Sequence, residues 1–221
     1  METLFESYRL LLEITPTDYI RSFHNKINWK NRLIGLVGQK GVGKSTLLLQ
    51  HIKKYDNIEE TLYVQADDMY FSGHGLYETA YDFYKRGGKR LYIDEIHKYK
   101  GWSTEIKMIY DKLPKMSVVY SGSSLLALKK GNSADLSRRA IEYAMPGLSF
   151  REYLNIAYGW NLKTASLDDI LHGGVDFPYS EHRPLKFFEE YCRKGYYPLS
   201  CPRTGTRPAA LCLCSCARIP A

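Results

Sequence analysis

Gly38-Gln39-Lys40-Gly41-Val42-Gly43-Lys44-Ser45 fits the pattern G-x-x-x-x-G-K-[ST], in which a glycine-rich loop binds nucleotide phosphates. The pattern has this meaning only where a strand precedes the loop and a helix follows it. Arg32–Val37 contains an apolar run of strand length, and Thr46–Ile52 is rich in helix formers and has no helix breaker. Both flanks therefore agree with a phosphate-binding loop.

The residue types of this loop suit the chemistry of phosphate binding. Glycine permits positive φ and leaves room for phosphate oxygens to touch the backbone. The N–H groups of the loop then converge on the anion, at the positive end of the following helix. The Lys44 ammonium can reach the β- and γ-phosphates, and the Ser45 hydroxyl can ligate Mg²⁺. We therefore expect ATP and Mg²⁺ as cofactors, with these residues in the nucleotide site: Gly38, Gln39, Lys40, Gly41, Val42, Gly43, Lys44, Ser45 and Thr46.

Composition is that of an ordinary globular protein. Of 221 residues, 44% are hydrophobic and 25% are charged. No apolar run approaches the ~20 residues that span a bilayer, and the first residues lack the basic and then apolar pattern of a signal peptide. We expect a protein without membrane segments, located in the cytoplasm, where nucleoside triphosphates are plentiful.

The last 21 residues differ from the rest of the chain. They contain Arg203, Arg207 and Arg218 but no acid, so that residues 1–200 carry only +4 of the net charge of +7. Four of the five cysteines also fall there, at positions 201, 212, 214 and 216. A metal site is one interpretation, but the paired C-x-x-C spacing and a nearby histidine are missing. We expect residues 201–221 to be a poorly ordered, non-native ending.

Strand-like and helical segments alternate along the chain. The further strand-like runs are Thr61–Val64, Lys89–Glu95, Ser117–Ser121 and Ala140–Met145. Amphipathic helical patterns separate them, for example Leu76–Lys85. This alternation is typical of a parallel sheet with right-handed crossovers. We predict an α/β fold of the P-loop NTPase type, with three α/β/α layers and a five-stranded parallel sheet of order 5-1-4-3-2.

Four regions are expected from these patterns: an N-terminal helical segment (1–30), the P-loop ATPase core (31–147), a helical lid or start of a C-terminal segment (148–200) and the tail (201–221). The third region opens with Ser149 three residues before Glu152, which predicts a helix with a capping box. A further helix is expected over Pro184–Arg193.

Asp94 and Glu95 end an apolar strand, at the edge where parallel α/β sheets bind ligands. Asp94 can hold Mg²⁺ through water together with Ser45. A second carboxylate beside it can orient and deprotonate an attacking water. This arrangement favours hydrolysis over phosphoryl transfer to a second substrate. The alternative is that Glu95 is only a surface residue after a strand.

The sequence Asp94-Glu95-Ile96-His97 also spells a DExH box, which is typical of helicases. Helicases of that kind need two sheet domains, and 221 residues hold only one such domain beside its appendages. We therefore interpret His97 as a loop residue near the site.

Two further groups are candidates for contact with the γ-phosphate. Ser121 and Ser123 close a strand expected between the phosphate-loop strand and the Asp94 strand, and we favour Ser123 as the sensor hydroxyl. Arg138 and Arg139 precede the fifth strand, and an arginine aimed at the γ-phosphate would stabilise transition-state charge. The alternatives are that the serines are only the polar end of a strand and that the arginines belong only to a solvated basic turn. Whether the arginine serves its own site or that of a neighbour stays open.

Together these motifs resemble the AAA-type ATP-binding domain of prokaryotic ATPases that commonly carry a C-terminal domain of unknown function. The motifs are the phosphate loop, Tyr92–His97, Ser121–Ser124, Leu136–Arg139 and Leu148–Leu154. The resemblance covers roughly residues 8–200. It implies that Lys44 and Ser45 bind phosphate and magnesium, that Asp94 and Glu95 serve hydrolysis, and that Arg139 is the favoured arginine finger.

The family commonly has glycine where this chain has Arg138, and it continues beyond the point where the odd tail begins. The resemblance therefore implies a motor without its output domain. A nucleotide-gated binding module with negligible turnover is the main alternative to an ATPase, and an inert fragment is a third. Lys129, Lys130, Arg138 and Arg139 form a basic rim that makes DNA a conceivable partner, and an arginine finger makes a homo-oligomer conceivable.

Overall fold

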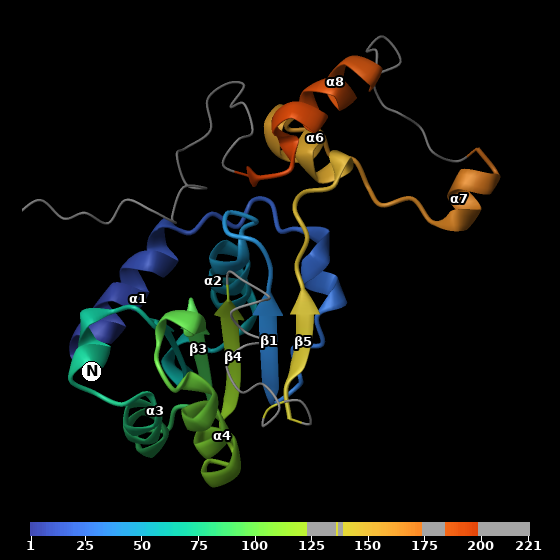
Figure 1. The fold of residues 1–221 in the computed structure, drawn as a ribbon. Coiled ribbons are helices and arrows are strands. Elements are labelled where there is room, and N and C mark those ends of the chain that lie inside the picture. Colours follow the sequence, from blue (N-terminus) through green and yellow to red (C-terminus); the bar gives the residue numbers. More distant parts are fainter. Residues whose placement is uncertain (123–135, 137–138, 174–183, 199–221) are drawn as a thin grey trace, which may run out of the picture. The chain divides into compact units, whose positions relative to one another are not determined.

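The computed structural model describes residues 1–122, 136, 139–173 and 184–198 (Figure 1). The described residues form two compact units, one within Met1–Pro146 and one within Gly147–Pro208. The tail (201–221), Ser123, Ser124, Lys129, Lys130 and Arg138 lie outside the described residues.

The first unit is built on a five-stranded parallel sheet. Its strands are β1 (Leu33–Val37), β2 (Thr61–Gln65), β3 (Arg90–Asp94), β4 (Ser117–Gly122) and β5 (Ile141–Ala144). Their order is β2-β3-β4-β1-β5, and every pair is parallel. This is the predicted α/β P-loop NTPase sheet, with the predicted strand order.

Helices cover both faces of this sheet. The helices are α1 (Glu2–Ile14), α2 (Lys44–Tyr55), α3 (Leu76–Lys85) and α4 (Trp102–Lys112). In Figure 1, α4 passes in front of the sheet and α2 lies behind it, which gives the three expected layers. Short 3-10 turns connect them: η1 (Ser22–Lys26), η2 (Ile58–Glu60), η3 (Met69–Ser72) and η4 (Ile96–Lys98). In the N-terminal segment expected to be helical (1–30), α1 is followed only by the short turn η1.

Burial explains why these segments form strands. Every residue of β1 is buried, as its continuous apolar pattern requires for a strand covered on both faces. Gly35 in the middle of β1 pairs with Tyr120 of β4. A Cβ atom at Gly35 would lie 2.6 Å from the Tyr120 hydroxyl oxygen, so that only glycine leaves room for this ring. The Tyr120 hydroxyl donates to Glu142 of β5 and so connects three strands.

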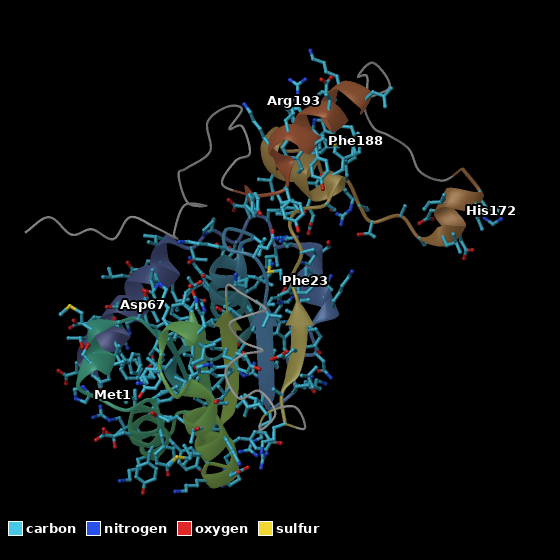
Figure 2. All side chains as sticks on the ribbon, viewed as in Figure 1. Met1, Phe23, Asp67, His172, Phe188 and Arg193 are labelled. Atoms are coloured by element: carbon cyan, nitrogen blue, oxygen red, sulfur yellow. The ribbon has the colours of Figure 1, made fainter. Side chains whose placement is uncertain are left out.

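The second unit is helical. It contains α6 (Phe150–Tyr158), α7 (Leu167–Leu171), α8 (Pro184–Glu190) and a π turn, η6 (Tyr191–Gly195). The capping box predicted at the start of α6 is present, since Ser149 and Glu152 bond each other's backbone N–H groups. Aromatic rings hold α6 against α8 and η6. Phe150 packs edge-on against Phe188, which Figure 2 labels, and the Tyr191 hydroxyl donates to the Leu148 carbonyl.

Candidate functional site

The glycine loop between β1 and α2 has the backbone that phosphate binding requires. Gly41 and Gly43 have φ values of 85° and 93°, in a region that side chains other than glycine rarely adopt. A Cβ atom at Gly38 would lie 2.5 Å from the Met145 carbonyl oxygen, so glycine is needed there as well. Helix α2 begins at Lys44, directly after the loop. Its positive end therefore faces the position that the loop encloses.

The Lys44 side chain lies inside the loop. Its ammonium donates hydrogen bonds to the carbonyl oxygens of Gly38 (3.0 Å) and Gln39 (2.9 Å). Ser45 is also buried. By contrast, Lys40 in the same loop is exposed to solvent. The loop thus provides one enclosed cation, the Lys44 ammonium, and one hydroxyl, that of Ser45, which can ligate a metal ion.

Arg21 forms hydrogen bonds that stabilise the phosphate loop. Its Nη1 atom donates to the carbonyl oxygens of Val42 (2.9 Å) and Pro146 (3.0 Å), and the residue is buried. The guanidinium therefore joins the phosphate loop to the segment that follows β5. Nothing in the sequence signals this contact, because it joins residues that lie 125 positions apart.

Asp94 ends β3 as a buried carboxylate held from both neighbouring strands. The Tyr63 hydroxyl on β2 donates to Oδ2 at 2.7 Å. The Ser121 hydroxyl on β4 donates to Oδ1, which also accepts the backbone N–H of Glu95 at 3.1 Å. Asp94 is only 1% exposed, so these donors compensate for the water that the carboxylate has lost.

Glu95 follows in an unusual backbone conformation. Its φ of 52° and ψ of 38° make it the one non-glycine residue with positive φ among the described positions. The Glu95 carboxylate lies 3.6 Å from His97 Nε2 and 3.8 Å from Lys98 Nζ. Left-handed backbone at a residue other than glycine costs free energy and is concentrated at functional sites. The short distance to Glu95 places His97 in a loop near the site, as expected.

Lys98 pairs with Glu95 and also with a carboxylate that follows β2, the outermost strand next to β3. Its ammonium lies 2.5 Å from the carboxylate of Asp67, which follows β2 and is labelled in Figure 2. The hydrogen bond with Asp67 raises the pKa of Lys98 above its ordinary value, and the charges of Asp67, Glu95 and Asp94 act in the same direction. Lys98 therefore stays cationic beside the carboxylates of Asp67 and Glu95. No sequence motif marks Lys98, although its position three residues after Glu95 could have suggested it.

Ser121 provides the hydroxyl between the two motifs. In the sheet, β4 lies between β1 and β3, and Ser121 pairs with Leu36, two residues before the loop. The Ser121 oxygen donates to Asp94 and accepts the N–H of Glu95 at 3.3 Å. Ser123, which we favoured for this role, lies outside the described residues.

Arg139 is not brought to the phosphate loop of its own chain. It precedes β5, which runs parallel to β1, whereas the loop follows the end of β1. Arg139 therefore lies at the edge of the sheet where the parallel strands begin, and the phosphate loop lies at the opposite edge, where the strands end. β1 has five residues, which at about 3.3 Å per residue separates these edges by roughly 16 Å. Arg139 instead forms hydrogen bonds with Asp111 near the end of α4.

The fold and this site define a class of P-loop α/β nucleotide-binding domains. The chain belongs to the AAA domain family, whose sequence pattern matches residues 30–154. An uncharacterized protein of Methanocaldococcus jannaschii is 30% identical over 160 residues, which is 67% of this chain and 33% of that protein. The chain thus spans about a third of the length of this relative.

Two solved structures match parts of this chain. C. elegans PCH-2 superposes with a TM-score of 0.41 at 18% identity, over 81% of this chain and 49% of that one. AMPPCP-bound DnaA from Aquifex aeolicus gives a TM-score of 0.46 at 16% identity, over 85% and 58%. Among the described helices, none has both the length and the apolar character needed to cross a bilayer.

Proposed function

We propose that this domain binds ATP with Mg²⁺ and hydrolyses it to ADP and phosphate. The observation that carries the proposal is the junction at the ends of β3 and β4, where Ser121 bonds both the Asp94 carboxylate and the Glu95 backbone. The enclosed Lys44 lies in the loop after β1, at the same edge of the sheet. Membership of the AAA domain family supports the same proposal.

The buried oxygen ligands fit magnesium. Mg²⁺ prefers oxygen ligands and keeps several waters. The Ser45 hydroxyl and the Asp94 carboxylate would hold it, directly and through water respectively. A bound magnesium ion supplies charge that neutralises the phosphate oxygens.

Residues of the chain itself would bind the phosphates, activate water and position the acidic groups. The glycine loop and Lys44 bind the β- and γ-phosphates with N–H and ammonium donors. Glu95 takes a proton from the attacking water and orients it. His97 and Lys98 lie beside its carboxylate. Ser121 keeps Glu95 and Asp94 in a fixed relation to each other.

Arg139 is proposed as an arginine finger for a neighbouring subunit, since its own phosphate loop lies at the other edge of the sheet. This proposal implies assembly into a homo-oligomer. Arg138 remains a candidate for the same role, and a protein or DNA target of the assembly is also a proposal. The reducing, ATP-rich cytoplasm is the proposed location. The domain limits at residues 30, 147 and 200 are likewise proposals.

Replacing Glu95 by glutamine tests the proposal, because glutamine keeps the shape of the side chain but is not a base. We expect single-turnover hydrolysis to fall by about 10²–10⁴, with ATP affinity in calorimetry unchanged. The matched control is Glu59→Gln, which changes an exposed carboxylate that precedes β2 at the other edge of the sheet.

A nucleotide-gated module with negligible turnover is the alternative function. It predicts that wild type and Glu95→Gln hydrolyse ATP equally slowly, at the uncatalysed rate. Equal rates well above that background would contradict the role of Glu95 but not the ATPase activity. Protein concentration must be high enough in these assays to permit assembly.

A further inference from the structure

Tyr63 has a contact that the functions assigned so far do not use. It lies in the middle of β2 and is 2% exposed, and its hydroxyl donates to Asp94 Oδ2 at 2.7 Å. Tyr63 and Asp94 come from neighbouring strands, since Gln65 of β2 pairs with Asp94. The tyrosine therefore reaches forward along the sheet to the last residue of β3.

This hydrogen bond complements that of Ser121. Ser121 bonds one oxygen of the Asp94 carboxylate from β4, and Tyr63 bonds the other oxygen from β2. The terminal torsion of an aspartate is broad and has no sharp rotamer of its own. The Ser121 hydroxyl and the Glu95 N–H both bond Oδ1, and donors to one oxygen alone leave this torsion freer to change. Donors to both oxygens fix the plane of the carboxylate, and Tyr63 supplies the donor to Oδ2.

We propose that Tyr63 is a positioning residue for the divalent cation, which it serves by fixing the orientation of Asp94. The inference rests on the proposed function, in which Asp94 holds Mg²⁺ through water. Groups that orient a metal-binding carboxylate through hydrogen bonds commonly change metal affinity by 10–100-fold when they are removed. Tyr63 itself does not touch the cation or the nucleotide in this scheme.

The chain contains a matched control one strand away. Tyr92 of β3 is the register partner of Tyr63, is also buried, and also donates its hydroxyl to a carboxylate. Its acceptor is Asp56, at the end of α2, at a distance of 2.6 Å. Tyr63→Phe and Tyr92→Phe therefore remove the same group from similar surroundings, but only the first changes the donors of Asp94.

The test measures cation affinity without turnover. Calorimetry follows the binding of a non-hydrolysable ATP analogue to each purified variant, first in EDTA and then over a series of Mg²⁺ concentrations. We expect Tyr63→Phe to raise the Mg²⁺ concentration needed for tight binding by about 10–100-fold. Analogue affinity in EDTA should match that of the wild type. Tyr92→Phe should match the wild type in both measurements.

Each other outcome contradicts a stated part of the inference. A Tyr63→Phe variant with wild-type Mg²⁺ dependence would overturn the role of Tyr63. Equal losses in Tyr63→Phe and Tyr92→Phe would attribute the effect to general packing and would overturn it too. If wild-type affinity does not depend on Mg²⁺ at all, the proposed magnesium site fails first and the inference fails with it. Melting curves of both variants show whether the fold is kept.

Discussion

Arg139 and Asp111 form a two-point salt bridge, with Nε 3.0 Å from Oδ1 and Nη2 3.2 Å from Oδ2. The pair is partly exposed and lies where α4 ends and β5 is about to begin, at the sheet edge away from the phosphate loop. Bidentate geometry fixes the guanidinium plane. This contact therefore keeps Arg139 in a defined position at the surface, as the proposed contact with a second subunit requires.

A mixing experiment tests whether Arg139 acts on a neighbouring subunit. Arg139→Ala keeps an intact nucleotide site, and Lys44→Ala keeps an intact arginine. Arginine fingers contribute about 10³–10⁵ in rate, so each variant alone should hydrolyse ATP at least about 10³-fold more slowly than the wild type. An equimolar mixture should recover a measurable part of the rate. A mixture no faster than either variant would exclude action between subunits.

Lys44 and Lys40 provide a matched pair in the phosphate loop. Lys44 is buried in the loop, whereas Lys40 is exposed. Lys44→Ala removes the charged donor facing the β- and γ-phosphates and should weaken ATP binding by about 2–3 kcal/mol. Lys40→Ala should change the affinity by less than about 0.5 kcal/mol, as surface substitutions do. Calorimetry that gives equal losses for both would contradict the assignment of Lys44.

Ser121 is expected to matter for turnover, because it bonds both acidic residues of the site. Ser121→Ala should lower the hydrolysis rate by about 10–100-fold, by analogy with other groups that orient ligands. Ser117→Ala is the control, since Ser117 begins the same strand at the opposite edge of the sheet. If both variants keep the wild-type rate, the hydroxyl of Ser121 has no part in positioning Asp94 or Glu95. Ser123→Ala, assayed beside them, tests the sensor position that the sequence favoured.

Stability should fall in mild acid because of His51. His51 is 4% exposed, and its Nδ1 lies 2.8 Å from Nε2 of His24. Burial lowers the pKa of His51 from 6.5 to about 3, and the positive charges of His24 and Arg90 act in the same direction. The unfolded chain thus binds a proton that the folded chain does not bind, between these two pH values.

The sign of this effect is defined by that difference in bound protons. The contribution of His51 to the free energy of unfolding is fully present above pH 6.5 and is lost as the pH falls towards about 3, the folded pKa of His51. The slope contributed by His51 approaches about 1.4 kcal/mol per pH unit. Urea unfolding at a series of pH values between about 4.5 and 7.5 measures this slope. His51→Gln should flatten the profile, and exposed His172→Gln should leave it unchanged; a wild-type slope in His51→Gln would contradict the assignment.

The sequence by itself determined the phosphate loop and the parallel sheet. Both follow from local patterns, because glycine spacing sets the loop backbone and apolar runs separated by helices specify parallel crossovers. The capping box of α6 is equally local, since Ser149 and Glu152 are three residues apart. Such features need no knowledge of which segments meet in space.

Only the tertiary structure decided which side chains surround Asp94. Tyr63 and Ser121 lie 31 and 27 positions away from it, and they meet it because β2 and β4 flank β3 in a particular register. Side-chain reach within that register has no local signature. For Arg139 a signal was present, because a residue before a parallel strand lies at the amino edge. Its salt bridge with Asp111, however, depends on where the packing of α4 against the sheet places Asp111.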